Sequence, residues 1–340
     1  MKEVRVGING FGRIGRCTLK HLVRRPGFKV AGINDLADIG DLAYLLKYDS
    51  VHGWYPPKVS STDREIQIDN EKIPFFSMKD PRQIPWKDVG ADIVIESTGA
   101  FRTGEKAAAH IQGGARKVVV SAPADGVDGT FCMGVNSDTY DTARHHVVSM
   151  ASCTTNSLAP VAKILHERWG VEHLFITTVH AYTSSQSLMD IPTRKRRRGR
   201  AAALSIVPTT TGAARATGLV IPELDGKMDG MALRVPVPDG SITDIVATLR
   251  EPATVDAVNQ AFLEASNEER FKGILRVSDE ALVSRDIIGD SHSAIIEGES
   301  TMVLDGRMVK VLVWYDNEWG YAARLADFAA FISERGLGGV

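Results

Sequence analysis

Short apolar runs separated by amphipathic segments make up the first half of the chain. The pattern predicts strands over residues 4–8, 29–34, 93–96, 117–120 and 131–135, and a helix over 14–25. Because these strand segments are apolar without strict alternation, they are typical of strands covered on both faces in a parallel sheet. The first half therefore predicts an open α/β sheet of the doubly wound type.

Longer segments, several with alternating apolar and polar positions, mark the second half. Strands are predicted over residues 174–180, 231–237, 241–249 and 308–315, with a loop over 181–201 and an amphipathic helix over 319–334. Alternation indicates strands with one open face, as in antiparallel sheets with helices on one side. This half is therefore expected to be an α+β domain with a mainly antiparallel sheet.

Composition narrows the protein class. A length of 340 residues, with 44% hydrophobic and 24% charged residues, is typical of a globular protein of two domains. No apolar run approaches the roughly 20 residues that span a bilayer, and the N-terminal residues run directly into a strand, so neither a membrane partner nor a secretory signal is expected. Three cysteines without metal-ligand spacing favour a reducing, cytoplasmic location and no metal site. A net charge of −2 gives no overall attraction to nucleic acid.

A glycine-rich motif, Gly10-Phe11-Gly12-Arg13-Ile14-Gly15, follows the first strand and opens the first helix. Asp35 stands 20 positions after Gly15, at the end of the next strand. This combination is the dinucleotide-binding fingerprint of a Rossmann domain, with the phosphates at the helix N-terminus and the acidic residue on the adenosine ribose. Since Asp35 would repel a 2′-phosphate, the motif favours NAD over NADP.

A cysteine occupies a conspicuous position in Ser152-Cys153-Thr154-Thr155-Asn156. The segment lies between an extended stretch, 146–150, and a helix predicted from about Ser157 to Trp169, which places Cys153 in the first helical turn. Backbone N–H groups and the helix dipole favour a thiolate there. His180, which closes a β-rich run, is a candidate base, although a buried cysteine or histidine alone is commonly structural.

Ordered blocks along nearly the whole chain resemble phosphorylating glyceraldehyde-3-phosphate dehydrogenases. They are Gly7–Arg16, Ala151–Asn156, His180–Thr183, Pro208–Ala214, Leu233–Pro236 and Trp314–Tyr321. The resemblance implies a homotetramer with an NAD-binding Rossmann domain over 1–151 and 318–340, to which the C-terminal helix returns. It also implies a catalytic domain over 152–317 that includes the 181–201 loop.

The resemblance further implies a reaction. Cys153 attacks the aldehyde of glyceraldehyde 3-phosphate, His180 takes the hydroxyl proton, and inorganic phosphate releases the resulting thioester as 1,3-bisphosphoglycerate, reversibly, in glycolysis and gluconeogenesis. The implied cofactor residues are Asn9, Gly10, Phe11, Gly12, Arg13, Ile14, Gly15, Asp35, Ser97, Thr98, Gly99, Ser121, Asn317 and Tyr321. Thr183 and Arg234 are implied for the substrate phosphate, and Ser152, Thr154, Arg198, Thr211 and Gly212 for the inorganic phosphate.

Two other functions compete with this interpretation. Erythrose-4-phosphate dehydrogenases share the fold, cysteine and histidine but hydrolyse the thioester; they commonly have glutamate at the position of Asp35 and lack the Thr211-Gly212 pair. A nucleic-acid-binding protein is the alternative from a different class. It would not need Cys153, His180 and the nucleotide motif together.

The most basic segment of the chain, Arg194–Arg200, contains six cations in seven residues. Related proteins commonly have an acidic and an apolar residue at the positions of Lys195 and Arg196, and often Asn-Asp at Ser184-Ser185. Three interpretations remain open: a solvated loop near a subunit interface, an anion site that tolerates the 2′-phosphate of NADP, or a contact for nucleic acid or an acidic protein.

Overall fold

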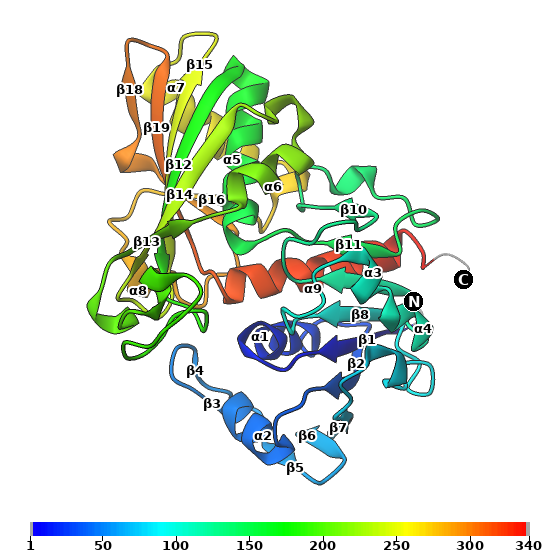
Figure 1. Cartoon of the computed structure of the whole chain (residues 1–340). Helices are drawn as coiled ribbons and strands as arrows, with labels where there is room; N and C mark the ends of the chain where they lie inside the picture. The colour runs from blue at the N-terminus through cyan, green and yellow to red at the C-terminus, as the bar shows by residue number, and fades with distance from the viewer. Residues whose placement is uncertain (1–2, 338–340) are drawn as a thin grey trace. The chain divides into compact units, whose positions relative to one another are not determined.

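The computed structural model describes residues 3–337, and the chain divides into two compact units (Figure 1). Unit 1 comprises the described residues of Met1–Phe131, Thr139–Ala151 and Ala322–Val340, and unit 2 comprises Cys132–Asp138 and Ser152–Tyr321. Residues 1–2 and 338–340 of the predicted NAD-binding domain lie outside the described residues. No helix in the described part of the chain is long and apolar enough to cross a membrane.

Unit 1 is built on a nine-stranded sheet. The strand order is β10 (Gly129–Thr130), β11 (Val147–Ser149), β9 (Lys117–Val120), β8 (Ile93–Glu96), β1 (Val4–Asn9), β2 (Phe28–Asn34), β7 (Glu71–Phe76), β6 (Glu65–Ile68) and β5 (Val59–Ser61). The strands from β10 to β7 are parallel, and β5, β6 and β7 pair antiparallel. The predicted doubly wound, mostly parallel sheet is therefore confirmed.

Helices and short strands complete unit 1. They are α1 (Arg13–Leu22), α2 (Ile39–Lys47), α3 (Gly104–Ala107), α4 (Ala109–Gln112), most of α9 (Trp319–Glu334), and a small hairpin of β3 (Tyr48–Asp49) and β4 (Gly53–Trp54). Strands β8 and β9 are buried at every position, as the unbroken apolar runs predict for strands covered on both faces.

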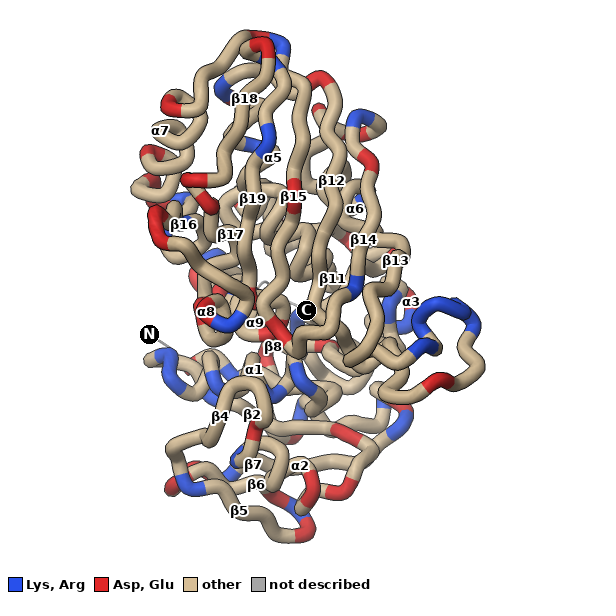
Figure 2. Tube along the Cα trace, turned by 90° about the vertical axis from the view of Figure 1, so that its left-hand side faces the viewer, with Lys and Arg blue, Asp and Glu red and all other residues tan. Residues whose placement is uncertain are grey.

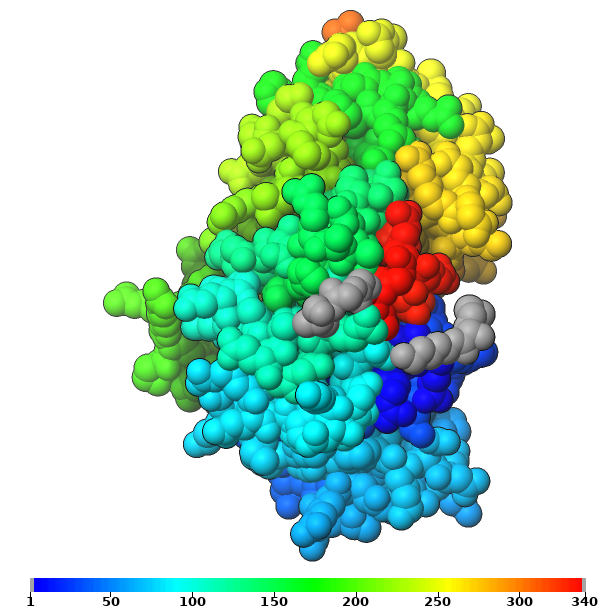
Figure 3. All heavy atoms as spheres, turned by 90° about the vertical axis from the view of Figure 1, so that its right-hand side faces the viewer, coloured from blue at the N-terminus to red at the C-terminus, as the bar shows by residue number. Residues whose placement is uncertain are grey.

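Aromatic packing attaches α9 to unit 1. Phe328 stacks on Phe131 with ring centroids 5.4 Å apart, and its ring meets Tyr140 edge to face at 5.7 Å. Arg25, which follows α1, donates a hydrogen bond to the carbonyl of Ala326 at 3.1 Å. In the space-filling view the end of this helix, in red, lies at the surface beside N-terminal residues in dark blue (Figure 3). Aromatic packing and this hydrogen bond thus join α9 to residues distant in the sequence, 301 positions apart for Arg25 and Ala326.

Unit 2 contains a mixed sheet of eight strands. The order is β13 (Val207–Thr210), β14 (Met228–Val235), β12 (Val171–Ala181), β15 (Ser241–Leu249), β19 (Met308–Tyr315), β17 (Ala294–Glu297) and β16 (Leu275–Ser278), with β18 (Met302–Leu304) also on β19. Only the pairs β12–β14 and β16–β17 are parallel. The predicted mainly antiparallel sheet is confirmed, and so are the bounds predicted for β15, β19 and α9.

Helices cover one face of this sheet. They are α5 (Cys153–Trp169), α6 (Ala213–Val220) and α7 (Val255–Ser266), and a short helix, α8 (Ser284–Ile287), follows β16 (Figure 1). Leu158, Val161 and Leu165 of α5 are fully buried in the core that this helix shares with the sheet. Figure 2 looks onto the opposite face, where the strands themselves face the viewer. Alternate residues of β12 and β15 are buried, which accounts for their alternating sequence pattern.

The strand predicted over residues 131–135 is wrong. A two-residue strand, β10, precedes this segment, and residues 133–136 form a turn in which Gly134 has a φ of 76°. The side-chain oxygen of Asn136 accepts the backbone N–H of Cys132 at 2.9 Å, which replaces a strand hydrogen bond. Since Cys132 and Val135 are still buried in the core, an apolar run at this position indicated burial and not extended backbone.

Candidate active site

A pocket of about 500 Å³ lies at the carboxyl ends of β1, β2 and β8 in unit 1. Its lining comprises Asn9, Gly10, Gly12, Asn34, Asp35, Leu36, Met78, Lys79, Ser97, Thr98, Ala100 and Phe101. Six of these were predicted from the sequence as cofactor residues. Ligands of doubly wound sheets bind at this edge of the strands.

The three glycines of the nucleotide motif have different surroundings. Gly10 has a φ of 91°, and a Cβ there would stand 2.6 Å from the backbone nitrogen of Thr98. A Cβ on Gly15 would stand 2.1 Å from the carbonyl oxygen of Gly10, whereas one on Gly12 would meet no atom within 4 Å. Gly10 therefore makes the turn, Gly15 permits the helix to pack on the loop, and Gly12 leaves a cradle that the pyrophosphate of NAD fits.

Asp35 closes the nucleotide loop from the second strand. One carboxylate oxygen accepts the backbone N–H of Phe11 at 2.6 Å, and the other accepts that of Ala37 at 2.9 Å. Each oxygen keeps a second lone pair, so the carboxylate can also accept from the ribose hydroxyls of NAD.

A buried carboxylate that the sequence analysis did not identify supports this pocket. Glu96, at the end of β8, accepts hydrogen bonds from Asn9 Nδ2 at 2.5 Å, from His110 Nε2 at 3.0 Å and from the backbone N–H of Thr98 at 2.8 Å. Trp86 donates to His110 Nδ1 at 3.0 Å, which places the imidazole proton on Nε2. An acidic residue that ends a buried apolar strand was the available signal. Glu96 is a positioning residue for Asn9 and Thr98.

Other predicted cofactor residues of unit 1 lie around the pocket without forming its lining. Arg13 pairs with Asp49 at 2.8 Å, and Ser121 donates its backbone N–H to the carbonyl of Glu96 at 2.9 Å. Phe11 is fully buried beneath the loop. The remaining two are Ile14, which lies in α1, and Gly99, which follows β8 in the sequence.

In unit 2, Cys153 begins α5. Ala151, with a φ of 52°, turns the chain from β11 toward this helix, in a conformation that costs a non-glycine residue about 1 kcal/mol. The hydroxyl of Ser152 caps the helix by accepting the backbone N–H of Thr155 at 3.1 Å, so the helix begins four residues earlier than predicted. The sulfur of Cys153 lies 3.5 Å from His180 Nε2.

Strand register brings His180 to Arg234. The two residues are direct partners on the parallel strands β12 and β14, and Arg234 Nη1 lies 2.6 Å from His180 Nδ1. The carbonyl oxygen of Ala181 lies 2.7 Å from the same ring nitrogen and accepts from Arg234 at 2.9 Å. In the tautomer that can act as a base, Nδ1 donates its proton to Ala181 and the Nε2 lone pair is directed at the sulfur of Cys153; the Arg234 guanidinium donates to Nδ1 only in the other tautomer.

Burial sets the protonation of these groups. It raises the pKa of the Cys153 thiol, although the charge of Arg234 and hydrogen bonds from Thr154 act in the opposite direction. Burial, and after it the charge of Arg234, lowers the pKa of His180 to about 3. Burial also lowers the pKa of Arg234 itself. The resting pair is therefore a thiol beside a neutral imidazole, a different state from the thiolate that the helix N-terminus by itself favours.

Hydrogen bonds orient the remaining predicted residues near α5 and β19. The Tyr315 hydroxyl lies 2.8 Å from the hydroxyls of both Thr154 and Thr178, and its ring meets His180 edge to face at 6.0 Å. Asn317 accepts from the Ser241 hydroxyl at 2.5 Å, which leaves the Asn317 amide nitrogen to donate. The last predicted cofactor residue, Tyr321, is buried in the first turn of α9.

The other predicted anion-binding residues lie in the long loop and at the start of α6. Arg198 donates to the hydroxyls of Ser185 at 3.1 Å and Thr209 at 3.0 Å, and Ser185 in turn lies 2.8 Å from the hydroxyl of Thr183. Thr211 and Gly212 stand at the N-terminus of α6, where the Thr211 hydroxyl accepts the backbone N–H of Ala213. These hydroxyls, guanidinium groups and helix N–H groups are suited to phosphate.

Two family models match the chain: the NAD binding domain of glyceraldehyde 3-phosphate dehydrogenase over residues 4–104, and the C-terminal domain of the same family over 152–317. A glyceraldehyde-3-phosphate dehydrogenase of Geobacillus stearothermophilus is 52% identical over 98% of this chain and 99% of its own length. Relatives with this name from Streptomyces coelicolor and Bacillus subtilis are 50% and 49% identical over the same shares. This chain belongs to the glyceraldehyde-3-phosphate dehydrogenase family.

Membership of the glyceraldehyde-3-phosphate dehydrogenase family confirms the resemblance and supports NAD as the cofactor. It gives no support to the erythrose-4-phosphate alternative. Tyr315 stands within a block that carried the resemblance, although no role was predicted for it. A tyrosine at an inward position of an alternating strand was a signal for burial, whereas its two threonine partners become visible only in the structure.

Because Arg234 lies next to His180, we expect a change at Arg234 to alter the pKa of this base of the dehydrogenase. Arg234→Leu should raise the pKa of His180 above about 3, because one positive charge that opposes protonation is lost. Burial remains, so the pKa should stay below the ordinary value of about 6.5. NMR titration of the histidine Cε1–H signals of the ligand-free protein measures this.

Arg276→Leu is the matched control for this titration, because Arg276 is an arginine of unit 2 that pairs with Asp290 at 3.0 Å. It should leave the His180 signal where it is. If Arg234→Leu also leaves it unchanged, Arg234 does not control the protonation of His180.

Proposed function

We propose that this protein catalyses the reversible oxidation and phosphorylation of glyceraldehyde 3-phosphate to 1,3-bisphosphoglycerate, as in glycolysis and gluconeogenesis. The observation that carries the proposal is the pairing of Cys153 with His180 at 3.5 Å, at the N-terminus of α5. A neutral imidazole facing a thiol is a base and nucleophile pair. The arginine on the strand next to His180 suits a phosphorylated substrate.

Proton transfer to His180 starts the chemistry. As the sulfur of Cys153 bonds to the aldehyde carbon, the thiol proton passes to His180 Nε2 and then to the former carbonyl oxygen, which gives a hemithioacetal. His180 next accepts the proton of that hydroxyl as the carbon is oxidised to a thioester. NAD, when bound, supplies the acceptor for the hydride that leaves this carbon.

Binding of the substrate phosphate changes the basicity of His180. The substrate phosphate on Thr183 and Arg234 neutralises the guanidinium charge that lowers the pKa of His180, so a bound substrate strengthens the base. Inorganic phosphate, held by Ser152, Arg198, Thr211 and Gly212, then attacks the thioester carbon. The C–S bond breaks, the acyl phosphate leaves, and the proton of the attacking hydrogen phosphate passes through His180 to the sulfur of Cys153. Thr154 acts in the site through Tyr315, because the Thr154 hydroxyl forms a hydrogen bond with the Tyr315 hydroxyl.

Residues of unit 1 bind the adenosine and pyrophosphate of NAD in this proposal. In unit 1, Gly10, Gly12 and Gly15 shape the cradle, Asp35 accepts from the ribose, and Asn9, Ser97 and Thr98 line the pocket. In unit 2, the amide nitrogen of Asn317 donates to the nicotinamide carboxamide, and Tyr321 lies beside the nicotinamide ring. Since Asp35 disfavours a 2′-phosphate, NAD is preferred over NADP.

The requirement for phosphate tests the proposed mechanism. With glyceraldehyde 3-phosphate and NAD, we expect sustained formation of NADH only when inorganic phosphate or arsenate is present, because the thioester otherwise stays on Cys153. NADH absorbance measures the rate, and erythrose 4-phosphate serves as the comparison substrate. Full turnover without phosphate and arsenate, or faster turnover of erythrose 4-phosphate, would contradict the proposal.

We also propose that the protein is a homotetramer of the cytoplasm. The open face of the unit 2 sheet supports assembly, because it exposes large apolar side chains: Phe175 is 65% exposed, Leu304 64% and Met302 56%. The three cysteines, which lack metal-ligand spacing, fit a reducing compartment. Sedimentation of the intact protein tests the assembly, and a monomer would contradict it.

A further inference from the structure

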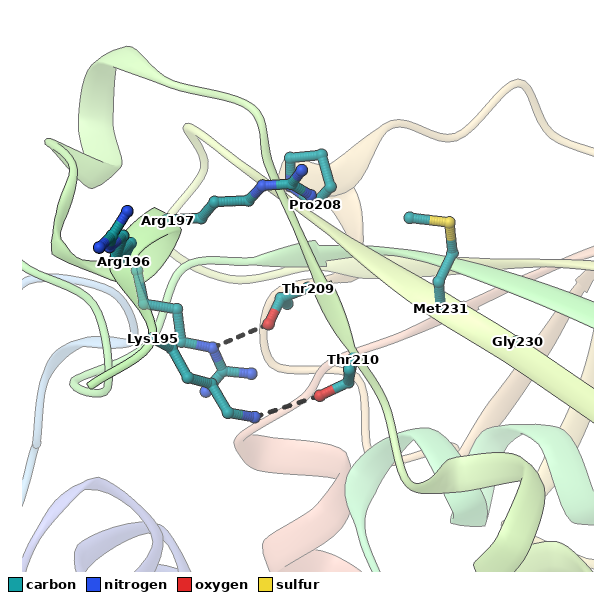
Figure 4. Close-up of a pocket in the computed structure, with 9 residues that line it drawn as sticks. Lys195, Arg196, Arg197, Pro208, Thr209, Thr210, Gly230 and Met231 are labelled. Atoms are coloured by element: carbon teal, nitrogen blue, oxygen red, sulfur yellow. Dashed lines mark hydrogen bonds between the residues drawn. The ribbon is translucent and has the colours of Figure 1, made fainter. Parts of the chain in front are cut away.

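The basic segment of the long loop forms one side of a pocket in unit 2, here called the basic pocket (Figure 4). Its lining consists of Lys195, Arg196, Arg197, Arg198, Pro208, Thr209, Thr210, Gly230 and Met231. The cations come from a short 3-10 helix, Arg196–Gly199, and the residue before it, and the other residues come from β13 and β14. The volume of about 520 Å³ lies within the range of small-molecule sites, about 300–1,000 Å³.

Hydroxyl groups, which carry no charge, hold two of these cations. Lys195 donates to the hydroxyl of Thr210 at 3.1 Å, and Arg198 donates to that of Thr209 at 3.0 Å (Figure 4). Across the described range 3–337, no carboxylate forms an ion pair with residues 195–198. The loop's own ion pair, Arg200 with Asp190 at 2.8 Å, involves no residue of the pocket lining. The basic pocket therefore keeps four positive charges.

These charges are concentrated in one place. Figure 2 shows the basic segment as a continuous blue stretch of a projecting loop. Ser185 accepts a hydrogen bond from Arg198 at 3.1 Å and carries no charge that would neutralise it. A cleft lined by charges of one sign attracts the opposite charge strongly.

The basic pocket adjoins the residues proposed for inorganic phosphate. Arg198 belongs to both sets, and Thr210, which holds Lys195, directly precedes Thr211 in the chain. We propose that the basic pocket is a second anion subsite, which binds the outer phosphate groups of a linear inorganic di- or triphosphate while one end group occupies the inorganic-phosphate site. Such an anion competes for this site with inorganic phosphate, which is the acceptor of the acyl group. This inference rests on the proposed function of Arg198 and Thr211.

The lining favours a compact anion over nucleic acid. Its three remaining residues, Pro208, Gly230 and Met231, are not aromatic, so among the nine described lining residues there is no ring on which a base could stack. Ammonium and guanidinium groups with neighbouring hydroxyls match phosphate oxygens, and Arg binds them through two parallel hydrogen bonds.

Calorimetric titration of the intact, NAD-loaded protein with sodium tripolyphosphate tests the inference directly. The double variant Lys195→Asp, Arg196→Leu should bind tripolyphosphate at least about tenfold more weakly than the parent, because charge-assisted contacts are lost. Its affinity for orthophosphate, which needs only the shared site, should change by less than about threefold. Affinity of the parent should fall as KCl is added.

Arg194→Gln is the matched control, because it removes a charge from the same loop at a residue outside the lining. It should leave tripolyphosphate affinity within about threefold of the parent. Equal affinity in the double variant and the parent, an equal loss in Arg194→Gln, or no binding to the parent would each overturn the inference.

Kinetics separate the inference from the proposed function. In NADH assays of the parent, tripolyphosphate should inhibit competitively with phosphate and lose this effect in the double variant. Inhibition that is not competitive with phosphate would overturn the shared subsite. Because calorimetry needs no turnover, tripolyphosphate binding can be measured even if the phosphate requirement fails. Conversely, a failure to bind tripolyphosphate leaves that requirement intact.

Discussion

Cys153→Ser lowers kcat at least about 10⁴-fold, because a serine hydroxyl beside a neutral imidazole is a far poorer nucleophile than a thiol and forms no thioester. The substitution keeps the size of the side chain and the N-terminus of α5, whose cap comes from Ser152. We therefore expect unchanged folding and an NAD affinity close to that of the parent. Steady-state NADH formation and calorimetric NAD titration measure the two quantities.

Cys17→Ser is the matched control for this result. Cys17 is a buried thiol in α1 of unit 1, so the chemical change is the same but the site differs. It should retain kcat within a few fold of the parent, even if the melting temperature falls. If Cys153→Ser loses NAD binding and stability together with activity, Cys153 is a structural cysteine and the proposed mechanism fails.

Gly15→Ala destabilises the protein and weakens NAD binding. The added Cβ would stand 2.1 Å from the carbonyl oxygen of Gly10, and backbone cannot move aside as easily as a flexible side chain. Forced overpacking of this kind costs about 1–3 kcal/mol of unfolding free energy. The nucleotide loop and the start of α1 must shift apart, which also distorts the cradle for the pyrophosphate. Chemical denaturation and NAD titration measure both effects.

Gly12→Ala separates the two contributions. A Cβ at this position meets no protein atom within 4 Å, so the unfolding free energy should remain within about 0.5 kcal/mol of the parent. The methyl group enters the space that the pyrophosphate needs, so NAD affinity should fall about tenfold or more. If Gly12→Ala binds NAD as the parent does, the glycine-rich loop does not hold the pyrophosphate in the proposed way.

Most of the fold could be predicted from the sequence because buried positions recur with the period of the strand or helix that carries them. Mostly apolar segments at 93–96 and 117–120 and alternation at 241–249 predicted the correct bounds of β8, β9 and β15. The same reasoning failed at 131–135, where the apolar residues are buried in a turn closed by Asn136. Hydrophobicity reports burial, and local side-chain hydrogen bonds decide the backbone conformation that achieves it.

Part of the candidate site was equally accessible from the sequence. The roles of Gly10, Gly12, Gly15 and Asp35 depend only on the local strand–loop–helix, so their spacing is enough to predict them. The pocket lining includes three of these four residues. Glu96 and Tyr315 were missed as positioning residues. Each acts through a partner far along the chain, Asn9 for Glu96 and Thr178 for Tyr315, and no local pattern records such contacts.

By itself, the sequence determined the fold class, the nucleotide motif and the identity of the nucleophile and base, because these depend on residue type and short-range spacing. Only the tertiary structure decided the chemical state of Cys153. The register of β12 and β14 places Arg234 next to His180, and desolvation of Cys153 and His180 disfavours the charged forms of thiol and imidazole. It also decided that residues 195–198 line a pocket without a neutralising carboxylate. Proximity and desolvation arise from packing between segments that are distant in sequence.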